Sequence, residues 1–302
     1  MKTCINTITL PGKAERRDLV MKKQYVTIEE ISRIELLNVM NEAFSDYVLN
    51  FHWNLESLER DLVENAISMK DSAVLRISGE DIGFFLVGFR ENTCRIGLMG
   101  MLKKFRGSGF GLEILDKIVE GCKWKNISKV ILEIPEMDLV SQKFYERYGF
   151  RISRKLISFY KTLPANEDLS LSLEPLPFKE VQDMAMRVSG EYHRKHNWYN
   201  DPKALSHLTK YNNFSGIKND DELLGYCIWS HKDEFAYVLD FGPAAGVDYN
   251  ELVEYLERAF GGSYDKLLLP WIPEDDVIFT MLSKKDFERI AVQKEMELRL
   301  AH

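Results

Sequence analysis

The chain of 302 residues is 45% hydrophobic and 29% charged, which fits a globular protein and argues against long disordered segments. Its length is about twice the roughly 150 residues of a common domain, so we expect two domains. The formal net charge of −7 argues against general nucleic-acid binding, and no apolar run approaches the roughly 18 residues of a membrane span.

The distribution of charge and the spacing of the cysteines predict where an anionic ligand binds and in which compartment the protein works. Residues 1–163 carry a net charge of +3 and residues 164–302 carry −10, so we expect an anionic ligand in the first part. The four cysteines are scattered, without a CxxC pair or a Cys/His cluster, which predicts no metal site and a reducing cytoplasm. Residues 1–21 lack the apolar core of a signal peptide and are expected to form a loose leader.

Apolar spacing and turn residues predict secondary structure along the first half. In chain order we expect a strand at 25–27, helices over 28–44 and 55–67, strands over 73–78, 82–90 and 93–102, a helix over 111–124, a strand over 130–134, a helix over 139–148 and a strand over 150–162. The predicted hairpin turns are Glu80-Asp81 and Glu91-Asn92, and Gly149 is a natural helix C-cap. An aromatic linker over residues 44–53 joins the first two helices.

The second half repeats the first in outline after a linker at 164–170. A shift of 137 residues places Gly109 on Gly246 and Phe150 on Phe287, and a shift of 142 places Gly83 on Gly225. Two shifts that differ by five residues, in the correct element order, favour a duplicated fold with domains at 22–163 and 164–302. The alternative is an unrelated α+β domain in the second half.

The most informative segment joins the strand over 93–102 to the helix over 111–124. Glycines accept positive φ and let the backbone approach a ligand, so consecutive N–H groups can form a concave anion site. The first helical turn adds unpaired N–H groups, and Lys104 and Arg106 add charge. The sequence therefore predicts a diphosphate site that consists of Arg106, Gly107, Ser108, Gly109, Phe110 and Gly111.

Other phosphate-binding patterns do not match. A P-loop requires Gly-Lys-Ser/Thr, which is absent, and the glycine spacing differs from the Gly-x-Gly-x-x-Gly of a dinucleotide fold. The tripeptide Asp240-Phe241-Gly242 lacks the preceding His-Arg-Asp loop of a kinase, so we interpret it as a coincidence.

Two motifs in order resemble the GNAT superfamily of acyl-CoA-dependent N-acetyltransferases. The pattern Arg-x-x-Gly-x-Gly/Ala appears as Arg106-Gly-Ser-Gly109-Phe-Gly111, and Asn-x-x-Ala-x-x-Leu/Phe-Tyr-x-x-x-Gly-Phe appears over residues 138–150. The resemblance covers residues 22–163. Three positions depart from the family pattern, because Asp138 replaces Asn, Ser141 replaces Ala and Lys103 replaces a common proline.

The resemblance implies an α+β fold of two GNAT-like domains, each a mixed, mostly antiparallel sheet flanked by helices. It implies acetyl-CoA as acyl donor, with its pantetheine arm between the splayed fourth and fifth strands and bonded to backbone of Met99 and Met101. Asp138 and Ser141 would lie near the cofactor arm, the former without the usual amide donor. Tyr145 would protonate the leaving thiolate as general acid, because its pKa of about 10 lies not far above that of a thiol.

The sequence patterns that concern the acceptor are less specific than those that concern the acyl donor. We expect a primary amine of a small molecule or peptide, and the acidic second half favours a cationic acceptor. By analogy the aromatic linker, which contains Asp46, Tyr47 and His52, forms an acceptor wall, although a plain core role is the alternative. Glu133, Asp46, His52 or water can serve as the base.

The second half has the element pattern of the same fold but lacks the residues that the resemblance assigns to cofactor binding and catalysis. Pro243–Asp248 replaces the glycine-rich motif, Asp248 would repel a phosphate, and Leu282 replaces Tyr145. We therefore expect a degenerate domain, in which the stretch from Tyr192 to Tyr199 can help to form an acceptor pocket. A non-catalytic acyl-CoA sensor or protein-interaction module is the alternative to an enzyme, and acceptor-dependent turnover distinguishes the two.

Overall fold

The computed structural model describes residues 22–49, 51–163 and 170–301, which pack into two compact units. Unit 1 takes in the described residues up to Leu132, Val140–Arg151 and those from Glu297, and unit 2 takes in Glu133–Leu139 and Ile152–Met296. The units interleave along the chain, whereas the sequence favours one division at residue 163. The expected leader, residues 1–21, and residues 164–169 of the expected linker lie outside the described residues.

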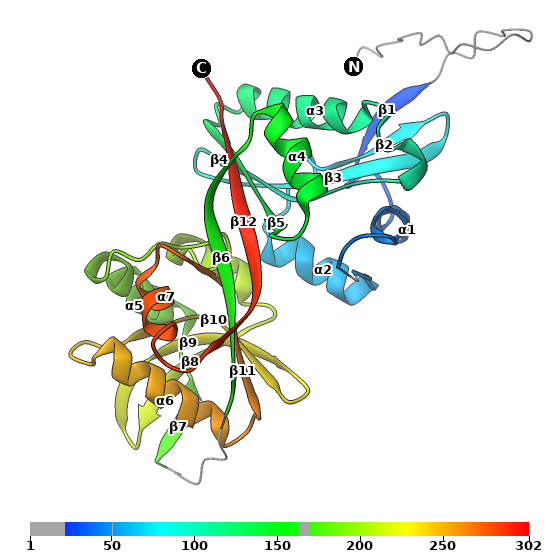
Figure 1. Ribbon diagram of the computed structural model, residues 1–302. Helices are drawn as coiled ribbons and strands as arrows, with labels where there is room; N and C mark the ends of the chain where they lie inside the picture. The colour runs from blue at the N-terminus through cyan, green and yellow to red at the C-terminus, as the bar shows by residue number, and fades with distance from the viewer. Residues whose placement is uncertain (1–21, 50, 164–169, 302) are drawn as a thin grey trace, which may run out of the picture. The chain divides into compact units, whose positions relative to one another are not determined.

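The strands of the first half form a sheet in the order β1-β2-β3-β4-β5, antiparallel except for the parallel pair β4–β5. In Figure 1, α3 and α4 lie on one side of strands β2–β4, and α1 and α2 lie on the other. The bounds are β1 Lys23–Thr27, α1 Arg33–Phe44, α2 Leu55–Glu64, β2 Ala73–Ile77, β3 Glu80–Arg90, β4 Thr93–Met101, the short 3-10 helix η1 Lys103–Phe105, α3 Phe110–Trp124, β5 Lys129–Pro135 and α4 Leu139–Tyr148.

Unit 2 contains strands in the order β12-β6-β11-β10-β9-β8-β7, in which β10 and β11 are parallel. A continuous apolar core, which includes Phe159, Tyr226 and Phe260, lies between these strands and their helices. The bounds are β6 Arg151–Thr162, β7 Leu171–Pro175, α5 Phe178–Glu191, the 3-10 helix η2 Pro202–Leu208, β8 Asn213–Asn219, β9 Glu222–Lys232, β10 Phe235–Pro243, α6 Tyr249–Gly261, β11 Lys266–Pro273, α7 Val277–Leu282 and β12 Glu288–Arg299.

The expected fold class is confirmed, and the elements repeat at the two expected shifts. Strands β3 and β4 recur as β9 and β10 after 142 residues, and the starts of β5 and β6 recur as those of β11 and β12 after 137. The difference of five arises because the loop after β10 is three residues shorter than that after β4, and α6 is two residues shorter than α3. No helix among the described residues is long and apolar enough to cross a bilayer.

Local geometry shifts some expected boundaries. The helix expected from residue 28 begins at Arg33, because Ser32 forms a capping box in which its hydroxyl accepts the N–H of Glu35 at 3.1 Å. The first hairpin turn is Ser78-Gly79, with φ of +50° and +90°, and not Glu80-Asp81. This turn requires positive φ at both central positions, and glycine meets that requirement best.

Helix α1 packs closely on β4 at Gly100. A Cβ at Gly100 would lie 2.6 Å from the Phe84 ring and 3.0 Å from both Ala43 and Phe44. Phe84 is fully buried in the core cluster that α1 and α2 form with the sheet. The absence of a side chain at position 100 therefore sets the distance between the end of α1 and the strand.

We expect Gly100→Ala to lower the free energy of unfolding by about 1–3 kcal/mol, because the buried Phe84 ring must move. Gly121→Ala is the matched control, since a Cβ at this position of α3 meets no neighbour within 4 Å. It should raise stability by about 0.5–1 kcal/mol through the better helix propensity of alanine. Urea unfolding followed by circular dichroism measures both, and equal effects would contradict the close packing of α1 on β4.

Candidate functional site

The loop between η1 and α3 has the backbone conformation of an anion site. Gly107 and Gly109 have φ of +75° and +93°, and a Cβ on either would meet no atom within 4 Å. These glycines are therefore required by conformation and not by space. Gly111 differs, because its Cβ would lie 3.2 Å from the Phe144 ring on α4.

The backbone N–H groups of residues 107–109 in this loop have no hydrogen-bond acceptor among the described residues. Helix α3 makes its first hydrogen bonds from Leu112 and Glu113 to the carbonyl of Gly109, at 3.0 and 3.2 Å. Within the part of the chain that the structure describes, no acceptor faces the backbone N–H groups of residues 107–111. The N-cap Gly109 has no side chain to satisfy them. Consecutive free amides at a helix N-terminus form a site for a phosphate group.

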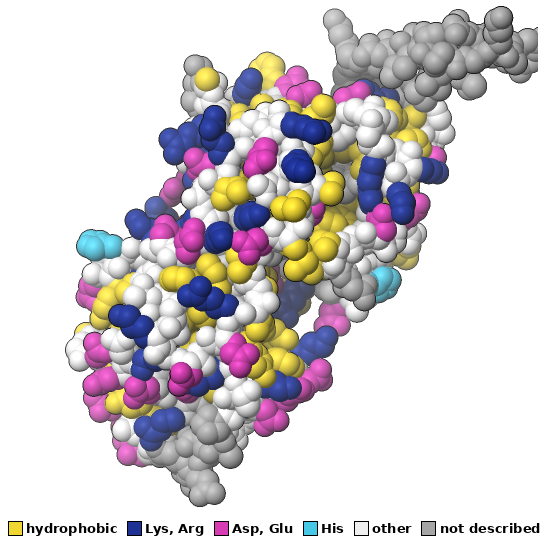
Figure 2. Space-filling model, viewed as in Figure 1, with side chains coloured by type: hydrophobic (Ala, Val, Ile, Leu, Met, Phe, Trp, Pro, Cys, Tyr) yellow, Lys and Arg dark blue, Asp and Glu magenta, His cyan; other side chains and the backbone are white. Residues whose placement is uncertain are grey.

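The basic side chains beside the loop are paired with carboxylates. Arg106 donates to Asp46 through Nη1 at 3.0 Å and Nη2 at 2.8 Å, and Lys104 pairs with Glu80. The expected free charges at the mouth of the loop are therefore largely compensated. Figure 2 likewise shows basic and acidic side chains interspersed over the face in view.

Asp46 is poorly suited to accept a proton. The hydrogen bonds from Arg106 lower the pKa of its carboxyl below the ordinary value, and Lys103 lies 3.3 Å from its second oxygen. A carboxylate with a lowered pKa holds a proton weakly near neutral pH. Among the base candidates from the sequence, His52 is exposed and Glu133, which belongs to unit 2, is half-buried.

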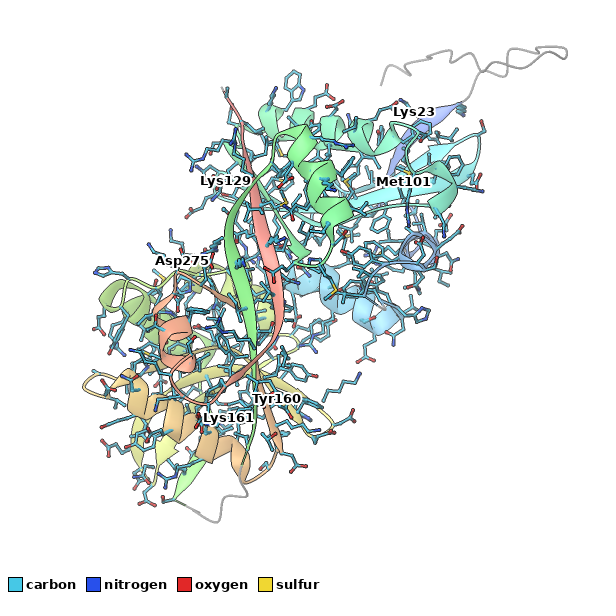
Figure 3. The ribbon with its side chains drawn as sticks, viewed as in Figure 1. Lys23, Met101, Lys129, Tyr160, Lys161 and Asp275 are labelled. Atoms are coloured by element: carbon cyan, nitrogen blue, oxygen red, sulfur yellow. The ribbon has the colours of Figure 1, made fainter. Side chains whose placement is uncertain are left out.

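Strands β4 and β5 pair only over Thr93–Arg95, opposite Lys129–Ile131. A bulge at Gly97, where the β3–β4 register shifts, precedes the unpaired part of β4. Successive residues of a strand direct their N–H and C=O groups to opposite edges, and the Leu102 N–H bonds to β3. The backbone groups of Met99 and Met101 therefore face the edge toward β5. Met101 marks the end of β4 far from Lys129 in Figure 3.

Helix α4 carries the candidate acid. Tyr145 is 8% exposed, and its ring makes edge contacts with Phe144 and Phe150 at centroid distances of 5.1 and 5.5 Å. Because Phe144 also contacts Gly111, the ring neighbours link Tyr145 to the loop. Ser141 is half-buried on the same helix, whereas Asp138 is buried and belongs to unit 2.

The aromatic linker forms a cluster at the end of α1, which consists of Phe44, Tyr47, Phe51 and Trp53. Phe51 stacks on Tyr47 and Trp53, with centroid distances of 5.8 and 5.4 Å. The Trp53 ring donates to Asp61 at 2.7 Å, and burial raises the pKa of that carboxyl. Phe51 is 38% exposed, so the cluster is partly core and partly surface.

In the second half, a side chain occupies the corresponding helix terminus. Asp248 caps α6 and accepts the N–H groups of Asn250 at 2.8 Å and Glu251 at 3.3 Å. The Asn250 N–H lowers the pKa of the Asp248 carboxyl, so that it is ionised at neutral pH. The donors that an anion would need are taken by the chain itself. Leu282, which replaces Tyr145, is fully buried.

The parallel strands of the second half also separate early, since β10 and β11 pair only over Phe235–Tyr237. Arg194 lies beside β10 and donates to the carbonyl of Phe241, which corresponds to Met99 at a shift of 142, at 3.4 Å. It also bonds to Asp240 and Asp276, each at 3.0 Å. All three charged side chains are at most 1% exposed.

Sequence reasoning missed this buried network. The stretch from Tyr192 to Tyr199, for which the sequence allows either a role in an acceptor pocket or partly buried structure, supplies Arg194 to this network. One signal was available, since Asp240 interrupts an apolar strand and a buried carboxylate requires a charged partner. His196 in the same stretch contacts Ser189 through Nε2 at 2.8 Å.

We expect Arg194→Met to lower the free energy of unfolding by about 3–5 kcal/mol, because two buried carboxylates lose their cation. Lys179→Met is the matched control, since Lys179 forms an exposed pair with Asp183 one turn away on α5. Its loss should change stability by less than about 0.5 kcal/mol. Urea unfolding measures both, and a small effect of the Arg194 change would show that the network contributes little.

Comparisons with known proteins agree with this geometry. Residues 70–152 match the family model described as an acetyltransferase (GNAT) domain, a range that includes β4, the glycine loop and α4. The chain is also 22% identical over 129 residues to the uncharacterized protein YxbD of Bacillus subtilis (strain 168), which covers 40% of this chain and 80% of that protein.

Two solved structures share the fold over most of the chain. A GCN5-related N-acetyltransferase from Sphaerobacter thermophilus superposes with a TM-score of 0.64 at 10% identity, over 92% of this chain and 95% of that one. A tandem GNAT protein from the clavulanic acid biosynthesis pathway superposes with a TM-score of 0.62 at 12% identity, over 93% and 99%. At these identities the likeness concerns the fold.

Proposed function

We propose that the protein is an acyl-CoA-dependent N-acetyltransferase, because residues 70–152 match the family model of a GNAT domain and the chain shares the fold of a tandem GNAT protein. One observation carries the proposal: the backbone N–H groups of residues 107–111, at a helix N-terminus, have no acceptor in the part of the chain that the structure describes. The diphosphate of coenzyme A is the anion that this family binds. The residues present therefore fit the donor in the first half.

The proposed roles follow from the backbone and from one tyrosine. The amides of residues 107–111 bind the diphosphate. The backbone groups of Met99 and the N–H of Met101, at the edge of β4 that faces away from β3, bond to the pantetheine arm, whereas the Met101 carbonyl accepts from Arg106. Acetyl-CoA supplies an activated thioester carbonyl. Tyr145 then donates its hydroxyl proton to the sulfur that leaves, while the acceptor nitrogen attacks directly in a ternary complex. Holding both reactants together supplies most of the acceleration.

For the acceptor we propose a primary amine of a small molecule or peptide, cationic before it loses its proton. The net charge of −10 on residues 164–302 favours such an acceptor. The aromatic cluster at the end of α1 offers a wall for its apolar part. Glu133, His52 or water takes the amine proton, since Asp46 is held by Arg106. A cytoplasmic setting agrees with three free cysteines, Cys94, Cys122 and Cys227.

The second half does not take part in donor binding in this proposal. Asp248 satisfies the helix terminus, and Arg194 bonds to the strand carbonyl that corresponds to Met99. An anionic donor would have to displace a carboxylate from its own helix. We therefore infer a single donor site in each chain.

Isothermal titration calorimetry with coenzyme A tests donor binding. We expect one site per chain and a loss of affinity of at least about tenfold in Gly109→Ala, because alanine resists φ of +93° and the loop amides are misplaced. Gly246→Ala is the matched control, since Gly246 has φ of +86° and the same open surroundings in the second half. It should bind as wild type does. Two sites, or no heat with wild type, would contradict the proposal.

Tyr145→Phe tests the proton donor. We expect kcat to fall by about 10²-fold or more with little change in KM for acetyl-CoA, since the phenyl ring keeps the packing against Phe144 and Phe150. Tyr148→Phe on the same helix loses a 2.8 Å bond to Asp116 and is the control, with kcat near wild type. Thiol release from acetyl-CoA across a panel of amines supplies the rates. Donor binding without acceptor-dependent release would favour a sensor.

A further inference from the structure

Arg106 joins three parts of unit 1. Its Nε donates to the carbonyl of Met101 at the end of β4, at 3.0 Å, and its Nη2 donates to the carbonyl of Ala43 in α1, at 2.7 Å. Two further bonds of 3.0 and 2.8 Å reach both carboxylate oxygens of Asp46. A bidentate guanidinium–carboxylate pair fixes orientation as well as distance. The first residue of the glycine motif is thereby attached to the end of α1.

The end of α1 continues into the aromatic cluster. Phe44, the last residue of α1, packs at Gly100 on β4 and makes ring contacts with Tyr47, Phe51 and Trp53. A continuous series of contacts therefore runs from the glycine loop through Arg106 and Asp46 to the end of α1 and these rings. A ligand that restricts the motion of the glycine loop therefore also restricts the motion of the aromatic cluster.

We propose that Asp46 and Arg106 are positioning residues whose bridge couples donor binding at the glycine loop to the aromatic cluster. This inference rests on the proposed function, because it takes residues 107–111 as the donor site and the cluster as the acceptor wall. A donor that immobilises the loop restrains the end of α1 through the bridge. The acceptor then binds to rings that are already ordered, so the two ligands bind with positive cooperativity.

A direct role of Arg106 on the diphosphate predicts the opposite result. If the guanidinium left Asp46 to bind phosphate, Asp46 would compete with the donor, and its removal would tighten binding. Arg106→Lys would then keep the affinity, because it keeps the charge. If Arg106 acts through its bridge to Asp46, Arg106→Lys should weaken donor binding, since lysine cannot form a bidentate pair together with two carbonyl contacts.

Coenzyme A is the probe, with two readouts on the full chain. Calorimetry at about 1 M salt, where the Debye length falls to about 3 Å, suppresses the long-range effect of removing a charge. Hydrogen exchange of residues 41–49, with and without coenzyme A, reports whether donor binding orders the end of α1. The variants are Asp46→Asn and Arg106→Lys, with Glu80→Gln as matched control, because Glu80 pairs with Lys104 at the same loop.

In Asp46→Asn and Arg106→Lys we expect affinity to fall by about fivefold, the order expected from one exposed bidentate pair, and the added protection of residues 41–49 to disappear. Glu80→Gln should leave unchanged both the affinity for coenzyme A and the added protection of residues 41–49. Unchanged or tighter binding in Asp46→Asn, unchanged binding in Arg106→Lys, or retained protection in either variant overturns the inference. Wild type that binds no coenzyme A refutes the donor site itself, which is a different failure.

Discussion

A helix N-terminus leaves several N–H groups that need an acceptor, and the two halves of this chain meet that need differently. In the first half Gly107 and Gly109 hold the backbone at positive φ, and no side chain among the described residues accepts from the first amides of α3. In the second half Asp248 fills the same role on α6 from within the chain. The proposed donor site thus lies where the chain leaves its own donors unsatisfied.

The same contrast holds at the strands. Both halves have a parallel pair that ends after three residues, and both have a bulge at the corresponding position, Gly97 and Leu239. In the first half the edge beyond the bulge faces no strand among the described residues. In the second, Arg194 bonds to that edge and brings buried carboxylates with it. The two halves therefore differ at Met99 and the corresponding Phe241, where Arg194 bonds to the strand edge of the second half, whereas in the first half Arg106 bonds to the next outward-facing carbonyl, that of Met101.

Much of this arrangement can be predicted from short segments of the sequence. Glycine spacing, apolar periodicity and the shifts of 137 and 142 residues predict the loop, α4 with its bounds Leu139–Tyr148, and the repeat. These signals depend on a few neighbouring residues. The turn at Ser78-Gly79 was missed because Glu80-Asp81 also resembles a turn, and backbone φ decides between them.

Contacts between distant residues were not predictable in this way. Arg106 and Asp46 lie 60 positions apart, and nothing in either local pattern indicates that they pair, so both were assigned to binding or proton transfer. Arg194 and Asp276 are 82 positions apart. An ion pair depends on the fold that brings its members together, which periodicity does not describe.

The interleaving of the two units bears on how the chain is made. The Leu300 N–H bonds to the Ser128 carbonyl at 2.8 Å, and residues from Glu297 belong to unit 1, whereas Ile152–Thr162 of β6 belong to unit 2. During synthesis from the N-terminus, unit 1 lacks residues 297–301 until the described residues of unit 2 have been made. Cutting the gene between the halves would separate unit 1 from residues 297–301 and unit 2 from Ile152–Thr162 of β6.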